Sequence, residues 1–324
     1  MSAAWTADVV GPCLRAAFHD CGTYSSVMCT EVFGRPTGVC GGCNGTFKRE
    51  MEELIASNLT RFTQQNGMQL CYDFLWGTKN VAAAIRAHSG CASMTDADIL
   101  NLSGMVAVQK SGGLPSAGCN WLPGRPDAAG VDETPRLPVS SSDATTLMAV
   151  FAGYEFDTSM QFFNMEMAET VATLSGAHTV GQSRVRPVGP NSMGIGSMTV
   201  TDTVFDGEYY AEVATSTKGW FGPDHRSVVM GTGNKGWFGS DRHGLCNELS
   251  DPTLNLKDRH CLDEASPFAP YYKSYAADFQ ANNDAAFFSK FCKTYQMMSN
   301  IGLAFDPTDY ATNHFTITDA LLAP

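Results

Sequence analysis

The chain has 324 residues, of which 44% are hydrophobic and 17% charged, a composition typical of a globular protein with a sizeable core. Its formal net charge of −12 disfavours nucleic acids and anionic membrane surfaces as partners. The sequence contains no run of about 18 apolar residues, so we expect no helix that spans a membrane.

Eleven cysteines are many for a cytosolic enzyme. They do not form a zinc pattern, because the single Cys-x-x-Cys of Cys40 and Cys43 has no second pair at finger or ribbon spacing. We therefore expect disulfide bonds and a secreted or organellar protein, although residues 1–11 show no signal peptide. The odd count leaves at least one thiol outside the intrachain pairs.

Helical periodicity dominates the chain. Apolar residues recur at helical spacing in six segments, which are 5–20, 47–63, 96–110, 145–154, 165–178 and 284–300. Thr95 is the expected N-cap of the third segment, and Gly112 with Gly113 its stop. Residues 115–138 are rich in glycine and proline and should connect helices. No alternation of strands and helices is present, so the expected fold class is mostly α.

Residues 211–258 differ from the rest because they are rich in glycine and contain a repeat. The segment Lys218–Asp224 recurs 17 residues later as Lys235–Asp241. We interpret the repeat as a duplicated turn at the surface. The functional alternative is that Trp220 and Trp237 are exposed for substrate docking or electron entry.

Two short segments carry histidines that would suit haem iron chemistry. Leu14–Asp20 contains Arg15 and His19, which lie one helical turn apart on the same face. Leu174–Gly181 contains His178. Either histidine alone would more often be an ordinary core or surface residue, so the interpretation depends on the motifs around them.

These segments and their neighbours resemble the superfamily of plant, fungal and bacterial haem peroxidases. Leu14–Asp20 is similar to the distal helix of that family and Leu174–Gly181 to its proximal motif. Further similar segments follow the family's order, at Gly41–Thr46, Gly124–Asp127 and Phe205–Tyr210. The resemblance extends from residue 14 to about 302.

The resemblance implies one haem peroxidase domain over residues 1–324, with a two-lobed helical fold and haem between the lobes. The distal lobe would cover about 1–135. The proximal lobe would cover about 136–305, with a small β hairpin region and the repeated segment 211–258 as an insertion.

The resemblance also implies haem b as cofactor, with hydrogen peroxide and a small reductant as substrates. On the peroxide side, His19 would move the proton and Arg15 would stabilise the developing negative charge. Asn58 would accept the other ring N–H of His19, and Glu52 would support Asn58. Phe18 would line the haem.

On the other side of the haem, His178 would ligate the iron. Asp258 is the expected carboxylate partner of His178, and Asp241 is the main alternative, followed by Asp224. Arg184 would pair with a haem propionate or lie at the surface.

Structural features follow from the same resemblance. Asp98 and Arg125 would form a buried ion pair, and Cys21 with Cys43 a disulfide. Asp20, with Asn44 and Thr46, would belong to a weak or absent distal calcium site. A proximal site for potassium or weakly bound calcium would use four residues, namely Thr179, Thr199, Thr201 and Asp206.

The reductant is less clearly indicated. Met198 stands near the position where the family usually has tryptophan or phenylalanine, which disfavours a tryptophan radical and favours oxidation of small reductants at the porphyrin edge. The patterns expected of manganese-oxidising and ascorbate-using members are not present.

Two alternatives remain open. The helix that normally precedes the distal helix is missing from this sequence, which would suit a haem-binding homologue with a structural role and no turnover. A zinc or iron hydrolase that uses His19, Asp20 and His178 is the second alternative, although no third ligand lies at metal spacing.

Overall fold

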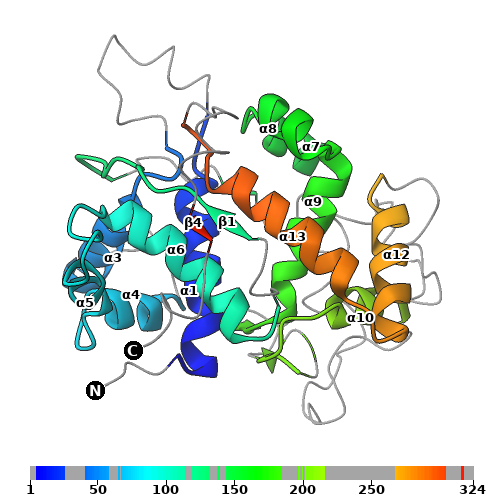
Figure 1. Ribbon diagram of the computed structural model, residues 1–324, viewed down its shortest axis with the longest axis horizontal. Coiled ribbons are helices and arrows are strands. Elements are labelled where there is room, and N and C mark those ends of the chain that lie inside the picture. Colours follow the sequence, from blue (N-terminus) through cyan, green and yellow to red (C-terminus); the bar gives the residue numbers. More distant parts are fainter. Residues whose placement is uncertain are drawn as a thin grey trace. The chain divides into compact units, whose positions relative to one another are not determined.

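The structure is a computed structural model. It describes residues 5–25, 41–57, 65, 67–113, 119–131, 137–138, 144–183, 196–197, 199, 201–215, 267–303 and 315–316. These residues are mostly helical (Figure 1), as the periodicity predicted. None of the described helices is long and apolar enough to cross a membrane.

The chain divides into two compact units. Unit 1 comprises Met1–Leu137, Gly153–Asn164 and Cys292–Pro324, and unit 2 comprises Pro138–Ala152 and Met165–Phe291. The division into a distal and a proximal lobe stays a prediction. The two returning segments belong to unit 1, where the Cys119–Cys292 disulfide secures the last of them.

Unit 1 contains six complete helices among its described residues. They are α1 (Ala7–Cys21), α3 (Thr46–Ser57), α4 (Gln69–Leu75), α5 (Val81–Arg86), α6 (Asp96–Lys110) and α8 (Asp157–Phe163). Strands β1 (Asn120–Trp121) and β4 (Phe315–Thr316) form a short antiparallel ladder, with Trp121 opposite Phe315.

Unit 2 contains four helices and one 3₁₀ turn among its described residues. They are α7 (Ala144–Ala152), α9 (Met167–Ser175), η2 (Gly176–Thr179), α10 (Glu208–Thr215) and α12 (Ala269–Gln280). Strands β2 (Gln182–Ser183) and β3 (Gly196–Ser197) pair antiparallel. Helix α13 (Ala285–Met298) is divided between the units after Phe291.

The contact between α1 and α6 forms the centre of unit 1. Ala16 and Ala17 of α1 are fully buried. Gly104 of α6 lies so close to this surface that a Cβ atom there would be 2.8 Å from Cβ of Ala17 and 2.2 Å from the Tyr295 hydroxyl. Small residues on both helices therefore allow a close approach, which fixes the position of α1.

Helix α6 begins and ends where the sequence predicted. The hydroxyl of Thr95 accepts the N–H of Asp98, so Thr95 is the N-cap. Gly112 follows the helix with a φ of +92°, a left-handed conformation that suits glycine. The helix is buried along nearly its whole length and therefore shows weak amphipathic periodicity.

The buried ion pair implied by the resemblance is confirmed. Nη1 of Arg125 lies 3.0 Å from Oδ1 of Asp98, and both side chains are almost completely buried. The backbone N–H groups of Gly124 and Arg125 also donate to Asp98, and Nε of Arg125 donates to the carbonyl of Ser299. The pair joins α6, the loop after β1 and the end of α13 within unit 1.

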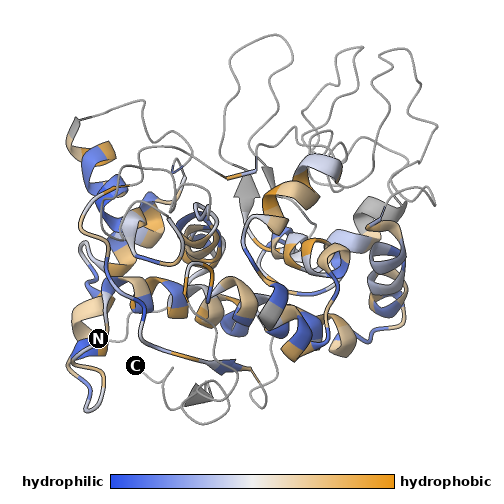
Figure 2. Cartoon of the chain, turned by 90° about the horizontal axis from the view of Figure 1, so that it is seen from above, coloured by the Kyte–Doolittle hydropathy of each residue, from blue (hydrophilic) through white to orange (hydrophobic). Residues whose placement is uncertain are grey.

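Most helices carry hydrophobic and hydrophilic residues on the same element (Figure 2). Periodicity predicted six of the described helices, which are α1, α3, α6, α7, α9 and α13. It did not predict α4, α5, α8, α10 or the twelve-residue α12. Helices of six to eight residues offer too few turns for a periodic signal.

Candidate active site

Arg15 and His19 lie one turn apart on α1, and their side chains are hydrogen-bonded to each other. Nε–H of Arg15 donates to Nε2 of His19 across 3.1 Å. Nε2 of His19 therefore acts as an acceptor, and the single proton of the neutral ring belongs on Nδ1. This tautomer offers a basic nitrogen beside a guanidinium.

A buried pair of side chains behind His19 maintains this tautomer. Nδ1 of His19 lies 3.2 Å from Oε1 of Gln65, and Nε2 of Gln65 donates in turn to a carboxylate oxygen of Glu50. Gln65 is fully buried, and Glu50 is 1% exposed. Because the Glu50 carboxylate can only accept, it turns the amide nitrogen toward itself and the amide oxygen toward His19.

The surroundings keep His19 neutral and Arg15 charged. Burial lowers the pKa of His19 well below its usual 6.5, and the nearby Arg15 cation lowers this pKa further, whereas the Gln65 hydrogen bond acts in the opposite direction. Burial also lowers the pKa of Arg15 to about 10, so the guanidinium remains protonated at neutral pH. The pair therefore presents a free base next to a permanent positive charge.

From the sequence we expected Asn58 and Glu52 behind His19. Asn58 lies outside the described residues. The side chain of Glu52 is 48% exposed and lies 4.0 Å from Nζ of Lys48 on the same helix. Glu50 is the glutamate of α3 that contacts Gln65, whereas the expected contact of Glu52 with Asn58 stays a prediction.

Helical geometry explains why Glu50 is the buried glutamate. Phe47, Glu50 and Met51 lie three and four residues apart and form the buried stripe of α3. A glutamate within an apolar stripe was therefore the sequence signal that could have identified Glu50. Gln65 carried no comparable signal, because it lies outside every segment in which helical periodicity was found.

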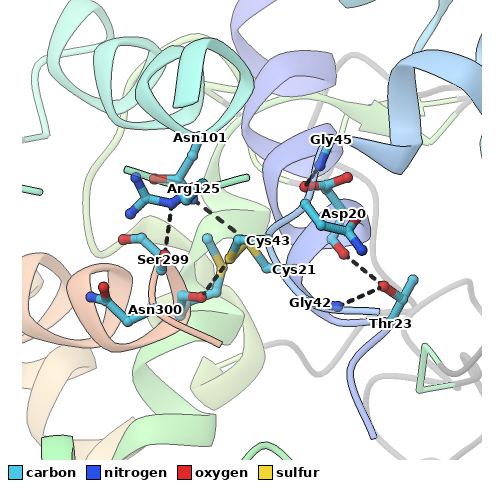
Figure 3. The surroundings of a disulfide bond; sticks show 12 residues. Asp20, Cys21, Thr23, Gly42, Cys43, Gly45, Asn101, Arg125, Ser299 and Asn300 are labelled. Atoms are coloured by element: carbon cyan, nitrogen blue, oxygen red, sulfur yellow. Dashed lines mark hydrogen bonds between the residues drawn. A yellow bond between two sulfur atoms is a disulfide. The ribbon is translucent and has the colours of Figure 1, made fainter. Parts of the chain in front are cut away.

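Two disulfides and a buried carboxylate secure α1 near the site. Cys13 forms a disulfide with Cys71 of α4. Cys21 forms a disulfide with Cys43, which confirms the pairing predicted from the resemblance. Asp20 accepts the backbone N–H groups of Gly45 and Phe47 at 2.9 and 3.1 Å. Figure 3 shows Asp20 and Gly45 beside the Cys21–Cys43 disulfide.

Asp20 therefore caps the N-terminus of α3 from another helix. The hydroxyl of Thr46 also approaches its carboxylate, at 3.4 Å, and the side-chain oxygen of Asn44 accepts the N–H of Thr46. Asp20 was expected as a weak calcium ligand together with Asn44 and Thr46. Hydrogen-bond donors occupy its carboxylate instead, an arrangement that favours a structural cap over calcium binding.

His178 lies in η2, the 3₁₀ turn that follows α9. Its half-buried ring packs edge-on against Tyr209, with the ring centroids 5.6 Å apart. Gly176 allows the same turn to pack closely on Tyr210 and Phe287, because a Cβ atom there would overlap the Tyr210 hydroxyl and lie 2.6 Å from the Phe287 ring. The turn therefore holds the His178 imidazole against a group of packed aromatic side chains.

The remaining residues expected near the haem are only partly described. Asp258, Asp241, Asp224 and Arg184 lie outside the described residues, as do Met198, Trp220 and Trp237. Phe18 is half-buried on α1, and its ring lies 6.4 Å from that of His19.

The four residues expected at a proximal cation site form one hydrogen-bonded group. The hydroxyl of Thr179 donates to Asp206 at 3.0 Å, and that of Thr199 donates to the carbonyl of Thr179 at 2.7 Å. Thr201 donates through its hydroxyl and its N–H to Glu208, which was not among the expected residues. Burial is the main cause that raises the pKa of Asp206, to about 6.

Within the described ranges, no group of three or more His, Cys, Asp or Glu side chains is arranged to hold a metal ion. The metal-hydrolase alternative that would use His19, Asp20 and His178 therefore gains no support.

A family model described as peroxidase matches residues 1–255 of the chain. This span is well over half of the 324 residues and contains the Arg15–His19 pair, Gln65 and His178. The chain belongs to the peroxidase family.

Curated relatives carry the names of two kinds of peroxidase. A probable L-ascorbate peroxidase 3, peroxisomal, from Oryza sativa subsp. japonica is 26% identical over 291 residues, which are 89% of this chain and 72% of that relative. A probable L-ascorbate peroxidase 4, peroxisomal, from the same organism is 29% identical over 202 residues, 62% of this chain and 54% of that relative. A mitochondrial cytochrome c peroxidase of Cryptococcus neoformans var. grubii serotype A is 26% identical over 301 residues, 90% of this chain and 61% of that relative.

The family and these relatives support a hydrogen-peroxide-dependent oxidoreductase that uses haem iron and a reductant. The described residues of this peroxidase fit a haem group. His178 offers a half-buried imidazole held by an aromatic base, which suits an iron ligand. His19 and Arg15 offer a neutral base and a cation, which suit the cleavage of peroxide.

Proposed function

We propose that this protein is a haem peroxidase that reduces hydrogen peroxide and oxidises a small reductant in one-electron steps. The observation that carries the proposal is the hydrogen-bonded series Arg15–His19–Gln65–Glu50. Such a series supplies a base of fixed tautomer next to a positive charge. Cleavage of an O–O bond with charge separation needs both.

When bound, haem b supplies the iron that binds peroxide and stores the oxidising equivalents. His178 would hold that iron, supported by Asp258 or Asp241, and Arg184 would pair with a propionate. Nε2 of His19 takes the proton of the peroxide and returns it to the departing oxygen, which leaves as water.

Arg15, Gln65 and Glu50 support this proton transfer by His19. Arg15 stabilises the negative charge that develops on the departing oxygen. Gln65, oriented by Glu50, keeps the single N–H proton of neutral His19 on Nδ1, so that Nε2 stays available as a base. The low pKa of His19 keeps Nε2 free of a proton at neutral pH.

A monovalent or weakly bound divalent cation near Asp206 belongs to the same proposal. The raised pKa of Asp206 arises mainly from burial, which penalises its negative charge. A potassium or calcium ion held by Asp206 with the oxygens of Thr179, Thr199 and Thr201 would offset that penalty.

The compartment follows from two observations. Relatives are named as peroxisomal, chloroplastic or mitochondrial proteins. Three disulfides are present among the described residues, which favours an oxidising environment. We therefore propose that the protein is organellar or secreted, without assigning ascorbate or cytochrome c as its reductant.

The proposed function is tested by two variants that should fail differently. In His19→Leu, haem binding is retained and the reaction with peroxide slows by more than the 10²–10⁴-fold that is typical of losing one acid–base group, because His19 serves as both acid and base. In His178→Ala, haem is lost or loosely bound. Stopped-flow absorption of the haem-reconstituted proteins, mixed with stoichiometric peroxide, measures both effects.

Either of two results would contradict the assignment. One is an unchanged peroxide reaction in His19→Leu, and the other is an unchanged haem spectrum in His178→Ala. A native protein that binds haem and never reacts with peroxide would instead support the haem-binding homologue without turnover.

A further inference from the structure

Five tyrosines of unit 2 gather beside His178 on two helices that lie side by side (Figure 1). Tyr209 and Tyr210 belong to α10, whereas Tyr271, Tyr272 and Tyr275 belong to α12. Four of these side chains are buried, and only that of Tyr271 is partly exposed. The cluster therefore extends from the histidine proposed to hold iron to the protein surface.

The buried rings are in continuous contact. Tyr209 lies 5.6 Å from His178 and 5.9 Å from Tyr272 between ring centroids, and the hydroxyls of Tyr209 and Tyr272 are 3.2 Å apart. The ring of Tyr210 lies 4.9 Å from those of Tyr272 and Tyr275. No gap wider than a ring contact separates His178 from Tyr275 along this series.

Tyr271 is the partly exposed member of the cluster. It lies one helical turn before Tyr275 on the same face of α12.

The hydroxyl partners distinguish Tyr271 from Tyr210 and Tyr275. The hydroxyl of Tyr210 donates to the backbone carbonyls of Ala172 and Thr173, which cannot take up its proton. That of Tyr275 pairs with the hydroxyl of Thr173. The hydroxyl of Tyr271 instead donates across 2.7 Å to the carboxylate of Glu166. A phenol that loses an electron also releases its proton, and Glu166 is a base placed to receive it.

We propose that this series of tyrosines carries oxidising equivalents from the haem side at His178 to Tyr271, where phenols too bulky to reach the haem are oxidised. The inference rests on the proposed peroxidase function, because the peroxide-oxidised haem is its oxidant. For each oxidising equivalent, one electron moves from Tyr271 through the buried tyrosines to the haem side. Tyr271 loses that electron, and its phenolic proton passes to Glu166.

The cycle then closes with a balance of electrons and protons. The bulky phenol gives one electron to the oxidised Tyr271 and releases its own proton to solvent. The proton on Glu166 returns to the Tyr271 oxygen. Each peroxide accepts two electrons, so two phenols are converted to phenoxyl radicals for each peroxide consumed.

Charge at the surface indicates which phenols would be accepted. Partial burial raises the pKa of Tyr271 to about 12, and Glu166 and Glu169 act in the same direction. Glu169 is itself paired with Nζ of Lys290 at 2.8 Å, which leaves Glu166, among the described residues, as the unbalanced charge of the two glutamates beside Tyr271. The chain as a whole carries a net charge of −12. Neutral and cationic phenols are therefore favoured over anionic ones.

The chain offers a matched control for Tyr271. Tyr24, in unit 1, donates its hydroxyl across 2.9 Å to the carboxylate of Glu155, and the pKa of Tyr24 is also raised to about 12. Tyr271→Phe and Tyr24→Phe each remove one surface hydroxyl and keep the ring, so both should fold. A purely structural role of the cluster predicts the same behaviour for the two variants.

The experiment uses the haem-loaded full chain, peroxide and a nitroso radical trap, with mass spectrometry to locate the adduct. Turnover is measured in parallel with free phenol and with phenol linked to dextran. We expect an adduct on Tyr271 in the native protein and in Tyr24→Phe, and its loss in Tyr271→Phe. Turnover of dextran-linked phenol should be lost in Tyr271→Phe alone, whereas turnover of free phenol should persist in all three proteins.

The outcomes separate this inference from the proposed function. Native protein that oxidises free phenol without a Tyr271 adduct overturns the inference and leaves the peroxidase function intact. Undiminished turnover of dextran-linked phenol in Tyr271→Phe also overturns it. Native protein that oxidises neither phenol overturns both.

Discussion

At the scale of single residues, the site depends on how four side chains orient one another. Arg15 donates to Nε2 of His19, Gln65 accepts at Nδ1, and Glu50 orients Gln65. Each contact restricts the next. The Glu50 carboxylate therefore determines, through Gln65, which ring nitrogen of His19 carries the proton. The consequences are testable at His19 and at Gln65.

The low pKa of His19 predicts how the peroxide reaction depends on pH. A histidine that acts as a base works in its neutral form, and burial and Arg15 hold the native pKa well below 6.5. The rate constant for the peroxide step should therefore stay constant as pH falls to about 6.5 and decrease only at more acid pH. Stopped-flow kinetics across this range measure it; a midpoint at or above 6.5 would contradict the environment described for His19.

The same pKa predicts the sign of a change in stability. Because the native pKa is lower than the unfolded one, the unfolded chain binds the proton more readily, and stability is lost as pH falls below about 6.5. Urea unfolding at pH 7.5 and 5.5 should show a smaller loss for His19→Leu than for the native protein.

Gln65 should act as a positioning residue. Gln65→Leu removes the acceptor for Nδ1 of His19, and we expect the peroxide step to slow by about 10- to 100-fold, as is typical when the partner of a functional histidine is removed. Glu52→Gln is the control, because the half-exposed Glu52 pairs with Lys48 instead. Equal rates for the two variants would remove Gln65 from the site.

At the scale of elements, α1 carries the reactive side chains, and its neighbours determine where they point. The helix packs closely on α6, and disulfides attach it to α4 and to the segment before α3. Asp20 at its end caps α3, the helix that carries Glu50. The placement of Arg15 and His19 therefore depends on packing distant from the reacting atoms.

Gly104→Ala tests this dependence on packing. The added methyl would meet Ala17 and the Tyr295 hydroxyl closer than van der Waals contact allows, so α1 and α6 would have to separate. We expect a loss of about 1–3 kcal/mol in the free energy of unfolding and a slower peroxide step. Gly130→Ala is the control, because nothing lies within 4 Å of a Cβ atom there. Chemical denaturation and stopped-flow kinetics measure the two effects, and unchanged values for Gly104→Ala would show that α1 is not held in this way.

At the scale of the whole molecule, covalent bonds join distant parts of the chain within unit 1. The Cys119–Cys292 disulfide spans 173 residues, and Arg125 adds a buried hydrogen bond to the carbonyl of Ser299 nearby in sequence. The segment after Phe291 therefore belongs with the N-terminal part of the chain, although unit 2 lies between them in sequence.

Removal of that disulfide should destabilise the protein. Replacing both Cys119 and Cys292 by serine is expected to cost about 2–5 kcal/mol, because the unfolded chain regains the freedom of a long loop. Cys91→Ser serves as the control, since Cys91 forms no disulfide. Thermal or urea unfolding compares them, and equal stability of the two variants would show that the bond does not secure the C-terminal segment.

Helical periodicity predicted the mostly α fold, and the resemblance of the motifs predicted the peroxidase family and the Asp98–Arg125 ion pair. The contact between Arg15 and His19 follows from short-range spacing, because a four-residue interval places two side chains on one helical face. The role of His178 as iron ligand stays a prediction. The identity of the residues behind His19 was decided only by the tertiary structure. Gln65 lies outside every segment with helical periodicity, and Glu50 was one of several neighbouring glutamates until packing of Phe47 and Met51 determined which of them was buried. The contacts of the tyrosine cluster likewise join helices more than 50 residues apart, a proximity that no local pattern encodes.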